Sequence, residues 1–363
     1  MMASGPRRIL IVKLKNIGDV LLTVPAIRAL HDRYPDAAIA ALVNAGTEEM
    51  LSGLPYLSRV FTYDRKRIKE KNFVGRCADE LRLMRDVRRF GCDLAIDFSG
   101  GDRGALCVAL SGAAVRVGFA KTGRGMLLRD RCFTRSVKPD HGKHTVEYHL
   151  DLIRAIEIEP KDTGLEIAVP ESDRAAVEKV LADKRIDRRK YVVIHPASRW
   201  FFKCWRADGF AAVADHIRSR YGLTVVLTAA PDRREREMVD AVLSCAKERH
   251  ADCAGLFSLK QIAALLRDSV LFLGIDSAPM HIAQAVRTPV IVLFGPSGVH
   301  NWGPRGKFDR VICRNWPCVP CGKDGCNGTK KSRCLDAITA EEVIKEVDDF
   351  FALRGTVTGN GKG

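Results

Sequence analysis

An aspartate follows a glycine directly after the first apolar run of the chain, where a carboxylate could do acid–base chemistry. In KNIGDVLLTVPAIRAL, Gly18 permits a tight turn and Asp19 stands at the start of a helix. On position alone, Asp19 is equally well interpreted as a helix cap or as a general base that faces a cleft. The glycines do not follow the pattern G-x-G-x-x-G, so the dinucleotide fingerprint is absent.

A second polar group follows the apolar run in FLGIDSAPMHIAQAV. Gly274 allows another backbone segment to approach closely. Ser277 and Ala278 begin a helix whose free N–H groups can hold a phosphate. His281 lies four residues after Ser277, so both side chains face the same side of that helix. The alternative is a helix capped by Asp276 or Ser277, with a histidine packed behind it.

A hydroxyl and two cations stand close together in HPASRWFFKCW, after another apolar run. Ser198, Arg199 and Lys203 combine a hydrogen-bond donor, a planar fork and a point charge, which suits a diphosphate. The alternative is a solvated loop, which is the usual place for isolated basic residues. That alternative explains poorly why aromatic residues alternate with the cations. These aromatic residues are Trp200, Phe201, Phe202 and Trp205.

Five of the twelve cysteines crowd between Cys313 and Cys334. Cys318 and Cys321 form a C-x-x-C pair, and Cys326 and Cys334 follow it. Four such thiolates can bind zinc, and a site without an open position would be structural. Free thiols or disulfides are the alternatives. The remaining cysteines are scattered along the chain and look like reduced thiols.

The composition is that of a globular protein with an anionic partner. The chain has 363 residues, 46% hydrophobic, and its formal net charge is +15. Such an excess favours a phosphorylated small molecule, an acidic membrane surface or nucleic acid. Aromatic content is only 7% and no motif that reads DNA or RNA is present, so we expect no nucleic-acid partner. The patterns of zinc proteases, P-loop NTPases and α/β-hydrolases are absent.

The start of the chain, MMASGPRRILIVKL, reads as a first strand and not as a signal peptide. The chain has no run of about 18 apolar residues, so we expect no transmembrane helix. We therefore expect a cytoplasmic protein, in contact at most with the face of the inner membrane. The basic amphipathic helix 73–90 could make that contact.

Strands and helices alternate twice along the chain, which predicts an α/β protein with two doubly wound parallel-sheet domains. We expect one domain at 1–170, a charged linker at 171–190 and a second domain at 191–340. A last helix at 341–354 and a disordered tail at 355–363 complete the chain. Open parallel sheets bind ligands at the carboxyl ends of their strands, which is where the polar groups above lie.

Taken together, these motifs resemble glycosyltransferase family 9, the ADP-heptose:lipopolysaccharide heptosyltransferases. The resemblance runs from ILIVKLKNIGDVLLTVPAIRAL through HPASRWFFKCW and GIDSAPMHIAQAV to PVIVLFGPSGVHNWGP, in the family's order. The sequence around FKCW and DSAPMHIA looks most like that of heptosyltransferase III-type members. The resemblance implies a GT-B fold, in which two Rossmann-like domains face a cleft. It also implies inverting transfer that requires no metal or other cofactor.

The resemblance implies roles for individual residues. Asp19 matches the family's catalytic base and Lys203 the lysine at the diphosphate, with Ser198 in the same loop. The N-terminal domain would take the acceptor, a lipopolysaccharide core on lipid A, and the C-terminal domain would take ADP-heptose. The sugar-nucleotide loop is matched by Asp276, Ser277, Ala278 and His281. Glu235, in AAPDRREREM, is the nearest counterpart of a family glutamate at the ribose, which leaves the nucleotide base open.

Two further interpretations remain open at this stage. The loop KTGRGMLLRDR, with Arg124 and Arg129, could dock phosphorylated core sugars or anionic lipid heads, or it could be a solvated basic face. The main alternatives to the heptosyltransferase function are another GT-B glycosyltransferase or a nucleotide-sugar epimerase. A nucleic-acid-binding protein with a zinc module is a further alternative, but it leaves Asp19 and the motifs at the strand ends without an explanation.

Overall fold

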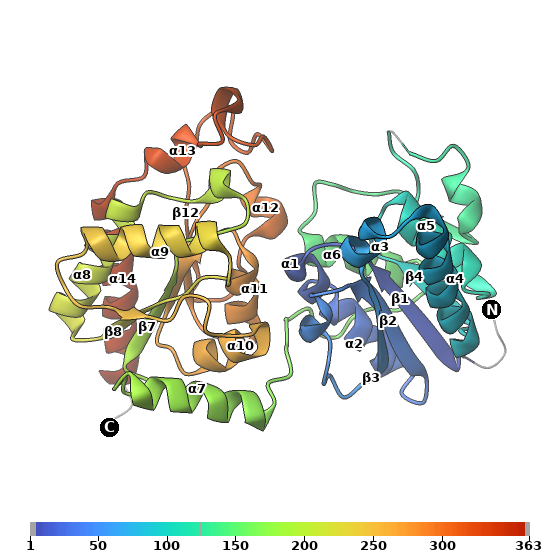
Figure 1. The fold of residues 1–363 in the computed structure, drawn as a ribbon, viewed down its shortest axis with the longest axis horizontal. Helices are drawn as coiled ribbons and strands as arrows, with labels where there is room; N and C mark the ends of the chain where they lie inside the picture. The colour runs from blue at the N-terminus through green and yellow to red at the C-terminus, as the bar shows by residue number, and fades with distance from the viewer. Residues whose placement is uncertain (1–4, 124, 360–363) are drawn as a thin grey trace. The chain divides into compact units, whose positions relative to one another are not determined.

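The chain folds into two compact units, residues 1–168 and residues 169–363. The computed structural model describes residues 5–123 and 125–359, and Figure 1 shows each unit as a sheet with helices packed around it. Within the described residues, no helix is both long enough and apolar enough to cross a bilayer.

Unit 1 contains one six-stranded parallel sheet with the strand order β3-β2-β1-β4-β5-β6. Its strands are β1 (Arg8–Lys13), β2 (Ala38–Asn44), β3 (Leu57–Tyr63), β4 (Leu94–Asp97), β5 (Val115–Phe119) and β6 (Arg135–Val137). Its helices are α1 (Ile17–Leu21), α2 (Val24–Arg33), α3 (Arg65–Glu70), α4 (Phe73–Phe90), α5 (Asp102–Leu110) and α6 (Thr145–Arg154), with short 3₁₀ turns η1 (Glu48–Met50) and η2 (Arg129–Cys132).

Unit 2 repeats this plan with the strand order β12-β11-β10-β7-β8-β9. Its strands are β7 (Tyr191–His195), β8 (Thr224–Leu227), β9 (Ala251–Asp252), β10 (Phe272–Ile275), β11 (Val290–Leu293) and β12 (Arg310–Ile312). Its helices are α7 (Glu171–Asp183), α8 (Ala207–Tyr221), α9 (Arg233–Cys245), α10 (Leu259–Arg267), α11 (Ala278–Ala285), α12 (Val299–Trp302), α13 (Arg333–Asp336) and α14 (Ala340–Gly359), with 3₁₀ turns η3 (Phe201–Lys203) and η4 (Cys326–Gly328).

The central strands are apolar because both faces of each sheet are covered by helices. Ile9 through Val12 of β1 are completely buried, and so is nearly all of β7. In unit 2, α8 and α14 pack against each other and share a core in which Trp205 is buried. The indole N–H of Trp205 donates a hydrogen bond to the Ile338 carbonyl at 3.0 Å, so the ring is satisfied inside the core.

Several local features follow the expected sequence signals. Helix α4 spans Phe73–Phe90, and Gly91 ends it in the left-handed conformation. The Ser258 hydroxyl accepts a hydrogen bond from the Gln261 N–H at 3.2 Å and begins α10. Pro25 lies in the first turn of α2, where its missing N–H removes no helical hydrogen bond.

The domain boundaries differ in detail from those expected. Segment 171–190 is not only a linker, because it contains α7 and belongs to unit 2. Only Val177 and Leu181 of that helix are buried, and six of its thirteen residues are charged. Helix α14 continues to Gly359, beyond the expected end at 354, and 360–363 of the predicted tail lie outside the described residues.

Each sheet reverses its strand order beside its first strand. In unit 1 this happens between β1 and β4, and in unit 2 between β7 and β10. At such a point the loops after two neighbouring strands leave in opposite directions and open a crevice for a ligand. The polar motifs after β1, β7 and β10 therefore lie at these two points.

Candidate active site

Lys203 and Asp276 form an ion pair at the switch point of unit 2. Lys203 ends the turn η3 in the loop after β7, and Asp276 directly follows β10. The distance from Lys203 Nζ to Asp276 Oδ2 is 2.6 Å. The Lys203 side chain keeps 22% of its surface exposed, whereas Asp276 keeps 8%. A nearly buried carboxylate thus holds an ammonium group that solvent and ligands can still reach.

The N-terminus of α11 lies directly after Asp276. Ser277 is the N-cap residue, but its hydroxyl makes no capping bond and is buried without a hydrogen-bond partner among the described residues. Buried hydroxyls are rarely left in this state unless a ligand or water completes them. His281 in the same helix is buried. The expected helix start is confirmed, and the helix presents free N–H groups beside Lys203.

Gly274 is required by a close approach of backbone in β10. A Cβ atom at this position would lie 2.8 Å from Cζ of Phe272 and 3.0 Å from the carbonyl oxygen of His195. Strands β7 and β10 pair in parallel at this point, with Gly274 opposite His195. The glycine therefore lets the two loops that carry Lys203 and Asp276 leave from closely packed strand ends.

The aromatic residues after β7 organise the loop that carries Lys203. Arg199 lies over the ring of Trp200 at 4.9 Å, and Arg234 of α9 lies over Phe201 at 4.2 Å. Ser198 is buried, and its hydroxyl accepts a hydrogen bond from the Trp200 N–H at 3.2 Å. Cation–π contacts and buried polar groups are not features of a freely solvated loop.

Glu235 lies in the first turn of α9 and is buried. One of its carboxylate oxygens accepts a hydrogen bond from the Ala230 N–H at 3.0 Å, and burial raises the pKa of this carboxyl group. His195 Nε2 lies 3.9 Å away, but burial lowers the pKa of His195 to about 4, so this ring is neutral near pH 7. Glu235 thus braces the loop after β8, and its contact with a ribose stays a prediction.

Asp19 caps helix α1 and keeps its carboxylate partly exposed. It is the third residue of α1, and its Oδ2 accepts a hydrogen bond from the Asn16 N–H at 3.3 Å. The side chain is only partly buried, so the carboxylate remains accessible while it caps the helix. The capping geometry is confirmed, and the role of general base stays a prediction.

A buried lysine ends the strand that precedes Asp19, and sequence reasoning missed it. Lys13 ends β1, and its ammonium donates hydrogen bonds to the Phe98 carbonyl at 2.9 Å and to His149 Nε2 at 2.8 Å. Since His149 Nδ1 lies 3.0 Å from the Leu22 carbonyl, Nδ1 carries the proton and Nε2 accepts from Lys13. Burial lowers the pKa of Lys13 to about 8, while the negative charge of Asp19 opposes that change.

The loops after β1 and β4 are joined to each other. The Leu14 N–H donates to the Ser99 hydroxyl at 2.8 Å, and the Ser99 N–H donates to Asp97 at 2.8 Å. Burial raises the pKa of Asp97 to about 6. These hydrogen bonds fix the strand ends on which Asp19 and the β4 loop depend.

Of the two arginines expected on a basic docking loop, one lies outside the described residues. That residue is Arg124. Arg129 is described, and it is buried at 5% exposure rather than displayed on a surface. Its guanidinium donates to the carbonyls of Gly100 and Phe119.

The cysteine-rich segment of unit 2 surrounds a cavity of about 420 Å³. Cys318, Cys321, Cys326 and Cys334 all line it. Among the described residues all cysteines are free, and no group of three or more His, Cys, Asp or Glu side chains is arranged to hold a metal ion. The zinc site stays a prediction. The Ser332 hydroxyl donates to the Phe202 carbonyl at 2.5 Å, so this segment contacts the Lys203 loop.

Comparison with known proteins shows which family this chain resembles. The model of "Glycosyltransferase family 9 (heptosyltransferase)" matches residues 80–331. The chain is 33% identical to lipopolysaccharide heptosyltransferase 3 of Escherichia coli K12 over 336 residues, 92% of this chain and 95% of the relative. It is 24% identical to the core heptosyltransferase OpsX of Haemophilus influenzae, with 86% of each chain covered.

Solved structures with the same fold include two glycosyltransferases. A family 9 glycosyltransferase from Veillonella parvula superposes with a TM-score of 0.80 at 22% identity, over 95% of this chain and 97% of the other. ADP-heptose heptosyltransferase II of Escherichia coli superposes with a TM-score of 0.76 at 20% identity, over 96% and 99%. Together with the two six-stranded parallel sheets, these likenesses confirm the expected GT-B class.

Proposed function

This chain belongs to glycosyltransferase family 9, and from that membership we propose that it transfers heptose from ADP-heptose to a lipopolysaccharide core. The transfer would invert the anomeric carbon and would need no metal ion in the reaction. The observation that carries this proposal is the Lys203–Asp276 ion pair at the N-terminus of α11. The name of the E. coli relative, lipopolysaccharide heptosyltransferase 3, supports the choice of donor sugar and acceptor class.

The donor diphosphate suits the switch point of unit 2. Lys203 supplies a mobile positive charge, and the free N–H groups at Ser277 and Ala278 supply fixed donors with the positive end of the helix dipole. The buried Ser277 hydroxyl, which has no partner among the described residues, would donate to the ligand. Asp276 would orient Lys203 before the donor arrives, because it holds the ammonium at 2.6 Å.

The acceptor hydroxyl is activated in unit 1. Asp19 would take its proton while the hydroxyl oxygen attacks the anomeric carbon of the heptose. The bond between that carbon and the diphosphate oxygen breaks, and its electron pair leaves with ADP. Negative charge grows on the leaving diphosphate, and Lys203 with the α11 N–H groups would stabilise it.

The deciding experiment measures transfer directly. Purified protein is mixed with ADP-heptose and a core acceptor that lacks the terminal heptose, and ADP release and acceptor mass are followed. We expect equimolar ADP and an acceptor heavier by one heptose. An epimerase would instead convert ADP-heptose without any gain in acceptor mass, and another glycosyltransferase would bind a UDP- or GDP-sugar more tightly. Retention of DNA or RNA in a band-shift assay at physiological salt would favour the nucleic-acid alternative.

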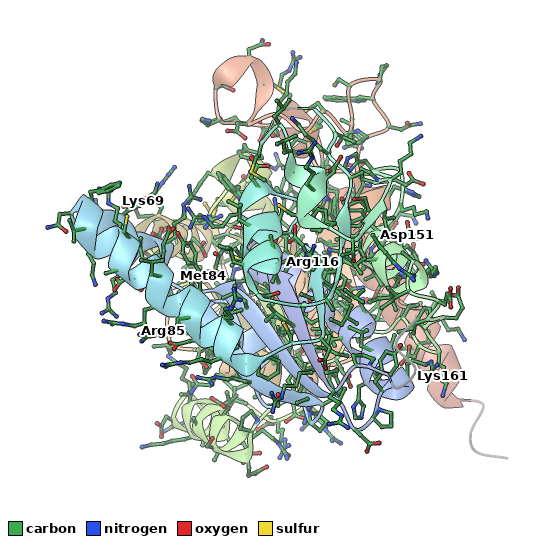
Figure 2. All side chains as sticks on the ribbon, turned by 90° about the vertical axis from the view of Figure 1, so that its right-hand side faces the viewer. Lys69, Met84, Arg85, Arg116, Asp151 and Lys161 are labelled. Carbon is green, nitrogen blue, oxygen red and sulfur yellow. The ribbon has the colours of Figure 1, made fainter. Side chains whose placement is uncertain are left out.

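The acceptor class also suggests contact with an anionic membrane surface. Helix α4 exposes three large apolar side chains, Phe73 at 77%, Val74 at 74% and Leu81 at 70%. Basic side chains such as Arg85 project from the same helix, as Figure 2 shows. Apolar groups among cations fit the interface of an anionic bilayer.

We expect cosedimentation with phosphatidylglycerol vesicles but not with phosphatidylcholine vesicles, and loss of binding in Phe73→Ser/Leu81→Ser. Equal binding to both vesicles would contradict the idea.

A further inference from the structure

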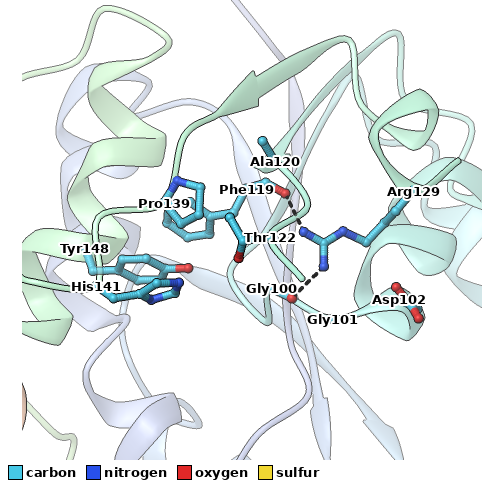
Figure 3. Close-up of a pocket in the computed structure, with 10 residues that line it drawn as sticks. All are labelled: Gly100, Gly101, Asp102, Phe119, Ala120, Thr122, Arg129, Pro139, His141 and Tyr148. Carbon is cyan, nitrogen blue, oxygen red and sulfur yellow. Dashed lines mark hydrogen bonds between the residues drawn. The ribbon is translucent and has the colours of Figure 1, made fainter. Parts of the chain in front are cut away.

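A polar cavity of unit 1 has no role in the chemistry above. Its volume is about 180 Å³, and it lies at the carboxyl ends of β4, β5 and β6 (Figure 3). We name it the Arg129 pocket. Its polar and aromatic lining comes from Gly100, Asp102, Thr122, Arg129, His141 and Tyr148.

The guanidinium of Arg129 is buried at this pocket and makes no salt bridge with any residue that the structure describes. It donates to the Gly100 carbonyl at 2.9 Å and to the Phe119 carbonyl at 3.0 Å, as Figure 3 shows. In the described part of the chain it forms no ion pair, and its Nε is buried without a hydrogen-bond partner. A buried cation is costly unless negative charge compensates it. The buried carboxylate of Asp97 supplies part of that charge without forming an ion pair, and the unsatisfied Nε leaves Arg129 able to accept a further anion.

Helix α5 begins at the rim of the same pocket. Its N-cap is Gly101, which has no side chain to accept the first N–H groups of this nine-residue helix. The carboxylate of Asp102 accepts a hydrogen bond from the Met126 N–H at 2.9 Å and does not pair with Arg129. The helix terminus adds positive potential to that of Arg129, and the Asp102 carboxylate at the rim partly opposes it.

Aromatic rings form the other wall. Tyr148 stacks on Phe119 with ring centroids 3.9 Å apart, and His141 stacks on Tyr148 at 5.7 Å. Burial raises the pKa of Tyr148 to about 12, so its hydroxyl remains a donor near neutral pH. A cation, a hydroxyl donor and ring faces together suit an anionic sugar.

We propose that the Arg129 pocket binds the phosphate or carboxylate of an acidic sugar in the acceptor. This inference rests on the proposed function, because it assigns a subsite to the same reaction. The β4 loop that forms the pocket is hydrogen-bonded to the loop after β1, through the Leu14 N–H and the Ser99 hydroxyl at 2.8 Å. An anion held after β4 and β5 would thus anchor the acceptor one strand away from Asp19 on the same sheet edge.

Direct binding of inorganic phosphate tests the pocket without the reaction. Calorimetry is done on the full chain with Lys203→Ala in every variant, which removes the lysine expected to bind the donor diphosphate. We expect phosphate to bind this background, and Arg129→Gln to weaken binding at least about tenfold. Arg131→Gln is the matched control, since Arg131 is an exposed arginine of the same turn η2. Equal binding by the Arg129→Gln and Arg131→Gln variants would overturn the pocket.

Acceptor kinetics identify the source of the anion. With wild type, enzymatic removal of the acceptor's phosphates should raise the acceptor KM at least about tenfold if a phosphate binds, and should leave KM unchanged if a carboxylate does. In either case Arg129→Gln raises the KM of the intact acceptor while donor KM stays constant. An acceptor KM unaffected by Arg129→Gln, in an active enzyme, would refute the inference.

Two safeguards keep the outcomes separate. If Arg129→Gln fails to fold, because Arg129 ties two loops together, Tyr148→Phe removes only a hydroxyl and keeps the ring stack. In Tyr148→Phe, phosphate must then bind more weakly and the acceptor KM must rise. If wild type transfers no heptose at all, the proposed function fails, and phosphate calorimetry still decides the pocket by itself.

Discussion

Lys203 and Asp276 are 73 residues apart in the chain, and their side chains meet at 2.6 Å where two neighbouring strands end. Each residue would be ordinary alone: a loop lysine, and a carboxylate before a helix. Together they place a partly exposed cation beside the N-terminus of α11. This pairing is the feature of unit 2 on which the proposed diphosphate site rests.

The ion pair predicts how single and double substitutions combine. Lys203→Ala should weaken ADP-heptose binding by about 2 kcal/mol, or roughly thirtyfold, because it removes a charged hydrogen bond and leaves Asp276 buried and unpaired. Asp276→Asn should cost less, since the ammonium remains. The double variant should bind better than Lys203→Ala alone, because the repulsive carboxylate is gone.

Calorimetry with ADP-heptose measures this double-mutant cycle. Lys345→Ala is a suitable control, since Lys345 is an exposed lysine that pairs with Asp349 on α14. Additive effects in the double variant would mean that the two side chains do not act together on the donor.

Asp19 permits a substitution that keeps the helix cap and removes the base. In Asp19→Asn the amide oxygen can still accept from the Asn16 N–H, so α1 should remain folded. Transfer should fall about a thousandfold, within the usual range for loss of a general base, while ADP-heptose binding changes little. Single-turnover transfer and calorimetry are the two measurements. Asp64→Asn alters another helix cap of unit 1 and should leave both unchanged. Retained transfer in Asp19→Asn would assign the base to another residue.

The sequence predicted those features that depend on neighbours along the chain. Apolar runs located the central strands, and the motifs around Asp19, Lys203 and Ser277 pointed to the correct strand ends. Contacts between distant segments were not predictable. Lys13 contacts His149, which lies 136 residues further along the chain, and no sequence pattern around either residue predicts that contact.

The same limit explains the basic loop and the linker. Arg129 looked like a surface cation because its neighbours are polar, yet the carbonyls after β4 and β5 enclose it. Helix α7 was not recognised because its two buried side chains, among alanines and charged residues, leave little periodic hydrophobic signal.

The raised pKa of Asp97 predicts a specific dependence of stability on pH. Burial raises the pKa of this carboxyl from 3.8 to about 6, so the native state holds the proton more tightly than the unfolded chain. The protonated Asp97 carboxyl therefore adds to the free energy of unfolding. This stabilisation is fully present below pH 4 and is lost as the pH rises through 6, a change on the order of 3 kcal/mol. Asp97→Asn cannot titrate and should lack this change.

Hydrogen exchange of the β4 amides is the suitable measurement, because it reports on unit 1 alone. The difference in opening free energy between Asp97→Asn and wild type should shift in favour of the variant between pH 4 and pH 7. Asp32→Asn, at an exposed position on α2, should follow wild type. A difference that stays constant over this pH range would show that Asp97 is not the titrating group.

The cysteine segment predicts a measurable metal content. Cys318, Cys321, Cys326 and Cys334 line one cavity, and thiolates are good zinc ligands. Because these thiols are not arranged as a ligand set among the described residues, zinc binding requires the segment to close around the ion. Bound zinc would hold Ser332 in place, and the Ser332 hydroxyl contacts the Phe202 carbonyl next to Lys203.

We expect about one zinc per chain by elemental analysis, and we expect the zinc to be lost in Cys318→Ser/Cys321→Ser. Cys77→Ser, an exposed free thiol of unit 1, should retain the metal. If wild type purified with zinc in all buffers carries no stoichiometric metal, the four cysteines are simply thiols, and Ser332 holds the Lys203 loop without help from an ion.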